Sequence, residues 1–343
     1  MPPLLRTWLQ LLRAPNLFTV PGDPLAGYLL ACYGAVESRI FLPVFASLFF
    51  YASGLLLNDL ADFAEDRAER PTRPLPSGAA SRCAATVVAV CLALAGLRLC
   101  AIAGTWTFGV GVALLLSIAS YNLGSKRIPV IGALNMGLCR GLSLLLGATA
   151  VPHGDLIIRL MLRGRLDHLL VAFLLVTLFI AAVTNLARFE TKSAVPCFAK
   201  GLPLLALVVG WFFFVPWNRY FPALQALTRS IAQLGSDLAA ARWRSAFQFG
   251  NNLDPSHGFI LAMLGFVLLS LLICTRVAWQ LTRNHARPLP PSIGDFIRLL
   301  LVIQAAFCVS TSTELNQVGY TFAILLVLLW PISRAVGKRF YAS

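Results

Sequence analysis

The amino-acid sequence predicts an all-α fold, a multi-pass bundle of nine or ten transmembrane helices that forms one domain over residues 1–343. Hydrophobic residues make up 58% of the 343 residues, charged residues make up only 12%, and the mean hydropathy is +0.77. A soluble domain carries about 25% charged residues, so this composition cannot cover a water-facing surface. The same figures exclude a disordered or collagen-like chain. Segments of alternating hydrophobicity, which a membrane β-barrel needs, do not occur.

The apolar runs set the number of spans. A helix needs about 20 mostly apolar residues to cross a bilayer. Two runs are short, and the last two could form one span and a re-entrant piece, which leaves nine or ten helices. Pro21 and Pro24 interrupt the first run, which we interpret as an uncleaved helix and not as a signal peptide. The runs cover residues 17–36, 40–57, 84–103, 105–120, 131–150, 168–187, 196–217, 257–279, 296–311 and 320–337.

The excess of basic residues is interpreted as an orientation signal. The chain has 28 Lys and Arg against 14 Asp and Glu, a formal net charge of +14. In a soluble protein this excess would suggest a nucleic-acid partner. In a membrane protein, Lys and Arg collect in cytoplasmic loops, and here they are concentrated on the side of the N-terminus. We therefore expect the N-terminus to lie in the cytoplasm. The expected partner is the lipid bilayer and not a nucleic acid, and the expected location is the plasma membrane if the protein is bacterial.

One long loop on the opposite side, residues 218–256, is predicted to be an extracytoplasmic insertion. Its apolar residues recur at helical spacing, and Arg229 and Asp237 lie off that face. This pattern is typical of a helix lying in the membrane interface. The apolar face consists of Leu224, Leu227, Ile231, Leu234 and Leu238.

The acidic residues are concentrated in one segment. Five of the 14 Asp and Glu residues lie between residues 59 and 69. If the second helix continues through this segment, Asp59, Asp62 and Asp66 fall within roughly 60° of arc, with Asn58 beside them. Carboxylates that converge without lysines between them suit Mg²⁺, which binds through a few carboxylates, waters and substrate phosphates. The alternative is an acidic helix end in a solvated loop.

Basic residues follow the acids directly. Arg67 and Arg73 lie in a loop that Pro71, Pro74 and Pro76 prevent from being helical. Arginines on a stiff loop can form forked hydrogen bonds to phosphate oxygens. Taken alone, basic residues beside a span are more often orientation signals, but their position after the acidic face favours a binding role.

Two further helices end in polar residues on the same predicted side. Tyr121, Lys126 and Arg127 follow the fourth run, and Asn185 and Glu190 follow the sixth. A bundle could gather these ends around one cavity mouth.

Arg140 lies in the middle of the fifth apolar run. An intramembrane arginine is costly and by default marks a functional site, although an ion pair that steadies the bundle is the alternative. Gly137 and Gly141 form a small-x-x-x-small pair, which we interpret as close helix packing.

These motifs together resemble the UbiA superfamily of intramembrane prenyltransferases. The resemblance extends from the first helix to about residue 200. It implies a helical bundle of about nine spans around a central cavity with polar caps at its cytosolic end. The matching motifs are Arg13-x-Pro-Asn16, Asn58-Asp59-x-x-Asp62-x-x-x-Asp66, Arg73-Pro-Leu-Pro-Ser-Gly78 and Tyr121 with Lys126-Arg127.

The resemblance also implies the roles of the site residues. Asp59, Asp62 and Asp66 would be Mg²⁺ ligands and catalytic residues. A second group would hold the diphosphate of a polyprenyl donor, and Asn16 and Arg140 would line the cavity. The residues that would hold the diphosphate are Asn58, Arg67, Arg73, Tyr121, Lys126, Arg127, Asn185 and Glu190.

One departure from the family pattern concerns the second aspartate motif, D-x-x-x-D, at the end of the sixth helix. Asn185 and Phe189 occupy that spacing, and Glu190 is the nearest acid. An asparagine can ligate a metal through its carbonyl oxygen, but phenylalanine cannot. This pattern, with the stretch from Cys139 to Gly147, is similar to the EboC-like branch.

The sequence thus predicts a Mg²⁺-dependent transfer of a prenyl group from a polyprenyl diphosphate to an unknown small-molecule acceptor. A non-catalytic relative that binds an isoprenoid or assists metabolite export is the main alternative. A secondary transporter is a third possibility, but such proteins gather ionisable residues at mid-membrane, whereas here they collect at one face.

Overall fold

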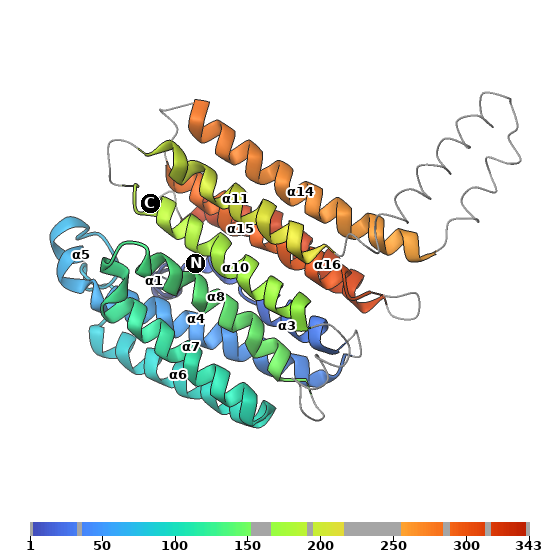
Figure 1. Ribbon diagram of the computed structural model, residues 1–343. Coiled ribbons are helices and arrows are strands. Elements are labelled where there is room, and N and C mark those ends of the chain that lie inside the picture. The colour runs from blue at the N-terminus through green and yellow to red at the C-terminus, as the bar shows by residue number, and fades with distance from the viewer. Residues whose placement is uncertain are drawn as a thin grey trace, which may run out of the picture.

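The computed structural model describes residues 3–32, 36–151, 166–190, 195–215, 255–283, 289–312 and 317–340. Within them the chain forms helices and turns and no strand (Figure 1). The elements are α1 (Pro3–Leu11), α2 (Ala14–Leu17), α3 (Gly22–Cys32), η1 (Ser38–Ile40), α4 (Phe41–Ala61), α5 (Phe63–Glu69), α6 (Arg82–Ala103), α7 (Thr105–Leu123), η2 (Ser125–Arg127), α8 (Ile131–Thr149), α10 (Leu166–Ala187), α11 (Cys197–Phe214), α14 (Pro255–Arg283), α15 (Leu289–Val309) and α16 (Val318–Phe340).

Nine helices of the described residues are long and apolar enough to cross a membrane, which confirms the predicted all-α, multi-pass bundle. They begin with the segment Ser38–Ala61 and end with Val318–Gly337. Large apolar side chains are exposed on their outer faces, as expected where lipid and not water surrounds the helices. Of the predicted insertion, residues 218–254 lie outside the described residues, so its interfacial helix stays a prediction.

The predicted first span, residues 17–36, is wrong as a continuous helix. The chain turns after α2, and α3 has only 11 residues. Its side chains from Asp23 to Ala31 are buried, because α8 and α15 pack against it. The apolar run therefore reflects burial in protein, and Pro21 and Pro24 mark where the helix begins.

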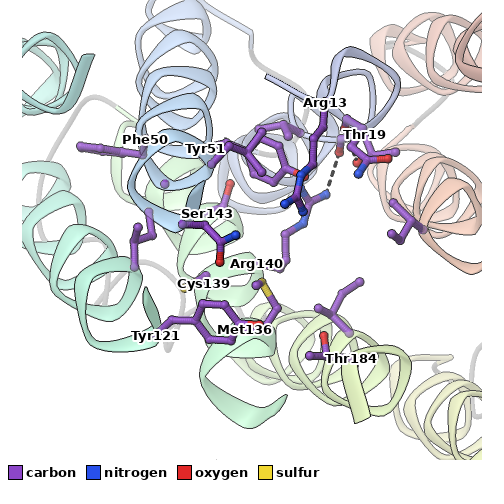
Figure 2. A pocket seen from close by; sticks show the side chains of 18 of the residues that line it. Arg13, Thr19, Phe50, Tyr51, Tyr121, Met136, Cys139, Arg140, Ser143 and Thr184 are labelled. Atoms are coloured by element: carbon purple, nitrogen blue, oxygen red, sulfur yellow. Dashed lines mark hydrogen bonds between the residues drawn. The ribbon is translucent and has the colours of Figure 1, made fainter. Parts of the chain in front are cut away.

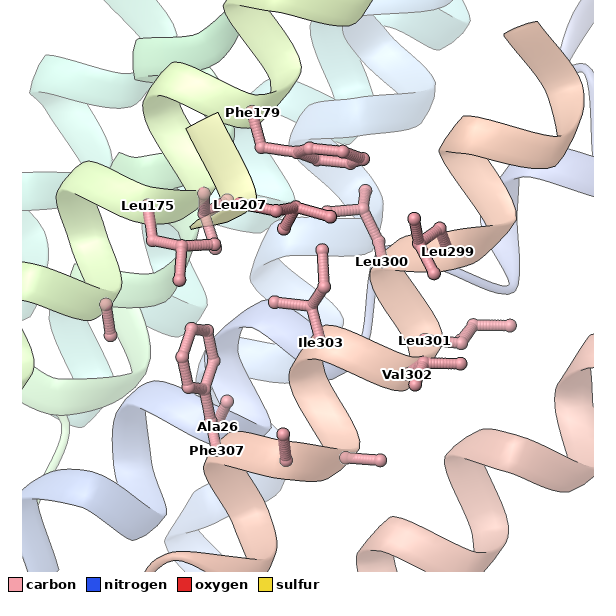
Figure 3. Packing of buried hydrophobic residues seen from close by; sticks show 14 of the residues in the cluster. Ala26, Leu175, Phe179, Leu207, Leu299, Leu300, Leu301, Val302, Ile303 and Phe307 are labelled. Atoms are coloured by element: carbon pink, nitrogen blue, oxygen red, sulfur yellow. The ribbon is translucent and has the colours of Figure 1, made fainter. Parts of the chain in front are cut away.

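Helix α15 lies at the centre of the bundle and is the most buried of the nine candidate spans. Figure 3 shows Leu300, Ile303 and Phe307 of α15 facing Phe179 of α10 and Leu207 of α11. These side chains belong to the largest apolar cluster among the described residues. The cluster holds α15 and α10 in place, and both helices also line the cavity described below.

Close backbone contacts fix α8 against its neighbours. A Cβ atom at Gly147 would lie 1.9 Å from the Pro24 carbonyl oxygen of α3, and one at Gly137 would lie 2.1 Å from the Thr177 carbonyl oxygen of α10. Apolar burial does not drive helix association in lipid, so close van der Waals packing at small residues is needed. The interpretation of Gly137 and Gly141 as packing residues is confirmed, because a Cβ atom at Gly141 would lie 2.2 Å from Thr177 Oγ1.

Substitution of Gly137 by alanine is expected to destabilise the protein, because the added methyl group must push α8 away from α10. Overpacking of this kind costs about 1–3 kcal/mol. The measurement is the Tm of the purified protein in detergent, with Gly109→Ala as the matched control, since nothing lies within 4 Å of a Cβ atom at Gly109. Equal Tm values for the two variants would contradict the close-packing interpretation.

Candidate active site

A cavity of about 300 Å³ opens among α4, α7, α8, α10 and α15, and the segment from Arg13 to Val20 closes one side of it (Figure 2). Each long helix contributes residues at helical spacing. On α8 these are Met136, Cys139, Arg140 and Ser143, which recur every three or four residues and so share one face. The predicted central cavity is therefore present.

The cavity is polar at its mouth and mainly apolar below it, with single polar side chains at depth. Asn58 and Tyr121 lie near the ends of α4 and α7, where the chain leaves the bundle. Ser47 lies 11 residues before Asn58, or about 16 Å deeper along α4 at 1.5 Å per residue. There its hydroxyl is hydrogen-bonded to that of Ser143 on α8 at 2.6 Å. Between these two levels the wall is mainly aliphatic and aromatic.

The acidic segment bends where the sequence predicts a straight helix. Helix α4 ends at Ala61 and α5 begins at Phe63, and Asp62 between them has φ −89° and ψ 3°. The three aspartates therefore do not form one continuous helical stripe. In the part of the chain that the structure describes, no group of three or more Asp, Glu, His or Cys side chains lies close enough to hold a metal ion. The expected straight helix is thus wrong, and the assignment of the three aspartates as Mg²⁺ ligands stays a prediction.

Instead, each aspartate has its own cation. Asp59 Oδ1 lies 3.3 Å from Arg13 Nη2. Lys126 Nζ forms a short ion pair with Asp62 Oδ1 and lies 3.4 Å from Asn58 Oδ1. These contacts connect α4 with the N-terminal segment and with η2. The polar residues at the end of α4 and after α7 are thus brought together as predicted, whereas Asn185 and Glu190 after the sixth run take no part in these contacts.

Asp66 differs from the other two. Its side chain is 6% exposed, and Arg73 Nη1 donates to both of its carboxylate oxygens at 2.8 and 2.6 Å. In contrast, Asp59 and Asp62 each bond to a cation through Oδ1 only. This difference favours a supporting role for Asp66, which holds the loop after α5 against the acidic segment.

The remaining predicted residues lie in three settings. Asn16, Asn58, Tyr121 and Arg140 line the cavity. Arg67 and Arg127 are exposed beside the mouth. Asn185 is half-buried at the end of α10, and Glu190 is exposed; neither residue is part of the cavity lining.

Arg140 is held by a buried polar network. Its Nε atom lies 2.8 Å from Asp23 Oδ2, and its Nη2 donates to the Thr19 carbonyl oxygen at 2.8 Å. Gln304 Nε2 donates to the same carbonyl oxygen at 2.9 Å and to Asp23 Oδ1 at 2.6 Å. The ion-pair interpretation of Arg140 is therefore confirmed, and the side chain also lines the cavity, while a functional role stays a prediction.

Sequence reasoning missed three residues of the site. Arg13 was noted only as part of a motif, and Asp23 and Gln304 were not singled out. Arg13 adopts a left-handed conformation, with φ 43° and ψ 54°, which is rare for a residue other than glycine and is common at functional sites. Arg13 could have been recognised from the sequence because it lies two residues before Pro15, which interrupts the first helix.

Comparison with known proteins decides the family. The model of the UbiA prenyltransferase family matches residues 24–224, more than half of the chain. The chain belongs to the UbiA prenyltransferase family. The match includes the acidic segment, η2 and the cavity-lining residues of α4, α7, α8 and α10.

Curated relatives of this family member are digeranylgeranylglyceryl phosphate synthases. The enzyme of Thermococcus kodakarensis is 30% identical over 147 residues, which cover 43% of this chain and 53% of the relative. That of Methanocaldococcus jannaschii is 31% identical over 147 residues, with 43% and 52% covered. The matched region thus spans about half the length of these relatives.

Solved structures of UbiA homologues share the fold. The homologue from Aeropyrum pernix K1 has a TM-score of 0.57 at 17% identity and covers 87% of this chain and 98% of its own. The homologue from Archaeoglobus fulgidus, described as bound to DMAPP and Mg²⁺, has a TM-score of 0.51 at 16% identity, with 96% and 98% covered. The resemblance to the EboC-like branch stays a prediction.

Substitution of Arg73 by glutamine is expected to destabilise the loop after α5, because the nearly buried carboxylate of Asp66 loses both of its hydrogen bonds. Leaving such a group unsatisfied costs about 1–3 kcal/mol. The measurements are the Tm and the rate of proteolysis between residues 67 and 80. The neutral pair Arg73→Gln with Asp66→Asn should recover most of the loss; a double variant as unstable as the single one would contradict this account.

Proposed function

We propose that the protein is a Mg²⁺-dependent intramembrane prenyltransferase, which transfers a prenyl group from a polyprenyl diphosphate to a small-molecule acceptor. The observation that carries this proposal is the juxtaposition of paired acids and bases with an apolar cavity in the membrane. The polar end suits a diphosphate, and the apolar interior suits an isoprenoid chain. We place this mouth on the cytoplasmic side, because the basic loops surround the mouth and Lys and Arg are concentrated in cytoplasmic loops.

The residues at the mouth fit Mg²⁺. The donor set consists of carboxylate and amide oxygens, the hard ligands that Mg²⁺ prefers. We assign ligation to Asp59 and Asp62, with Asn58 in support, because each of these aspartates keeps a carboxylate oxygen free of the ion pair described above. Asp66 would act through Arg73 and not by direct contact.

The ion pairs provide a source of diphosphate ligands. Arg13 and Lys126 hold the carboxylates that we assign to the metal, so both cations lie next to the place where a chelated diphosphate would bind. Arg13 and Lys126 would then bind diphosphate oxygens in place of the carboxylates. The Asp59, Lys126 and Asp62 side chains are only 13%, 14% and 21% exposed, so each pair would open only as the chelated diphosphate replaces the lost partner. Arg67 and Arg127 are further candidates at the rim.

The reaction breaks the bond between the prenyl C1 atom and the diphosphate oxygen, and the electron pair leaves with the diphosphate. The chemistry that Mg²⁺ supplies when bound is neutralisation of the charge on this leaving group. Arg13 and Lys126 add to that stabilisation, and Tyr121 can donate a hydrogen bond. A nucleophilic atom of the acceptor then bonds to C1 and loses its proton to the released diphosphate. Tyr51 and Tyr121 offer aromatic faces to the electron-poor carbon.

The second candidate function is an isoprenoid-binding protein without catalysis. Its support is the position of the second family motif, where Asn185 and Phe189 replace the aspartates and Phe189 packs on the apolar cluster. Incubation of the purified protein with labelled prenyl diphosphates and an acceptor panel that includes a glyceryl phosphate lipid separates the two. Binding of the donor without diphosphate release would favour this second function.

Replacement of Asp59 and Asp62 by alanine is expected to lower Mg²⁺-dependent diphosphate release at least about 100-fold, because the metal loses its ligands and the leaving group its stabilisation. The control is Glu65→Ala, an exposed acid on α5 of the same segment, which should retain full activity. Unchanged release in the double variant would refute the proposed site.

Substitution of Ser143 by phenylalanine is expected to shorten the donor that the cavity accepts, because Ser143 lies at the deep end. The ratio of kcat/KM for geranyl diphosphate to that for dimethylallyl diphosphate should fall about tenfold or more. The control is Leu116→Phe on the exposed face of α7. An unchanged ratio would show that the chain does not reach this depth.

A further inference from the structure

We propose that Arg140 forms an anion-binding subsite inside the cavity, which takes the carboxylate or phosphate group of the acceptor. The inference deepens the proposed function and rests on it for the identification of the bound anion as part of the acceptor. The binding site itself follows from the geometry of the arginine, its partners and the cavity wall.

The guanidinium group of Arg140 has one edge bound and one edge open. Its Nε and Nη2 atoms face Asp23 and Thr19. Nε is buried and meets Asp23 as an ion pair without a hydrogen bond, whereas Nη1 is not fully buried and no described residue accepts a hydrogen bond from it. Because the side chain is 9% exposed and lines the cavity, the open edge faces the cavity.

The network behind Arg140 holds this edge in place. Asp23 is fully buried on α3, and Gln304 is fully buried on α15. Together they fix the guanidinium plane from two helices, so little rotamer freedom is left to lose when a ligand binds. Arg140 is thus preorganised for a forked hydrogen bond to a carboxylate or phosphate. An arginine that served only to pair with Asp23 would not need hydrogen-bond donors that point into the cavity.

The charges of the cavity wall favour an anion over a neutral ligand. The described residues that line the cavity include two arginines, Arg13 and Arg140, and no Asp or Glu. The carboxylates that balance them, Asp59 and Asp23, lie outside the lining. An anionic group bound at Arg140 would therefore meet no like charge among these lining residues. The low dielectric of the bundle strengthens such contacts.

The subsite is separate from the diphosphate end. Arg140 lies nine residues into α8 from Ile131, or about 14 Å along the axis, whereas Lys126 lies before that helix begins. The acceptor's anionic group would therefore bind in the interior, and its nucleophilic atom would extend past Met136 towards the mouth. Acceptors without an anionic group would lack this anchor.

Three probes with the same aromatic body test the subsite on the full-length protein in detergent. Benzoate and phenyl phosphate should raise the Tm in a saturable way, and neutral benzyl alcohol should not. The stronger of the two anions identifies the carboxylate or the phosphate as the preferred group. Equal stabilisation by benzyl alcohol would overturn the proposal.

Variants locate the effect at Arg140. Arg140→Gln should weaken anion binding about tenfold or more, because the forked charge-assisted contact is lost, and Arg140→Lys should weaken it less. Since Arg140→Gln leaves Asp23 unpaired, the neutral pair Arg140→Gln with Asp23→Asn tests the same loss in a balanced network. Arg98→Gln, an exposed arginine on α6, is the matched control and should bind as the wild type does.

Donor binding separates this proposal from the proposed function. Stabilisation by geranyl diphosphate with Mg²⁺ should persist in the balanced double variant. Anion binding that is unchanged in that variant would refute the subsite. Anion binding that depends on Arg140 in a protein without any response to geranyl diphosphate and Mg²⁺ would support the subsite and refute the proposed donor reaction.

Discussion

Pairing of opposite charges within an apolar bundle is the constraint on which the site depends. Three aspartates near the end of α4 would repel one another, and each is instead neutralised by a cation from a different part of the chain. Arg13 comes from the turn after α1, Lys126 from η2 and Arg73 from the loop after α5. The same rule operates deeper in the bundle, where Asp23 balances Arg140. The aspartate pairs therefore mark the polar mouth of the cavity, and the Asp23–Arg140 pair marks a polar point on its interior wall.

Much of the fold could be predicted from the sequence, because lipid imposes long apolar runs and leaves polar residues at helix ends. The end of α4, the end of α7 and the position of Arg140 were all found in this way. The first span could not be placed, since an apolar run does not reveal whether lipid or protein surrounds it. Helix α3 is short and packed against α8 and α15, a contact between segments far apart in the sequence.

The details of the site depended on backbone geometry that residue spacing does not determine. A single turn at Asp62 breaks the helical stripe that the spacing of the aspartates predicts. The two partners of Arg140, Asp23 and the Thr19 carbonyl oxygen, are both held by Gln304, which lies 285 residues from Thr19. Conversely, the residue types alone show that Asn185 and Phe189 replace the aspartates of the second family motif. The structure adds that Phe189 packs on the largest apolar cluster.

Helix α2 in the N-terminal segment is joined to α16, the last described helix. Ser333 of α16 donates a hydrogen bond to the Pro15 carbonyl oxygen of α2 at 2.9 Å, across 318 residues of sequence. At the usual rate of synthesis, the segment that carries Arg13 must wait roughly 15 to 65 s for this neighbour. During that time the Pro15 carbonyl oxygen, two residues after Arg13, lacks this partner. The contact between α2 and α16 is thus a late step of biogenesis, which forms only after α16 has been inserted.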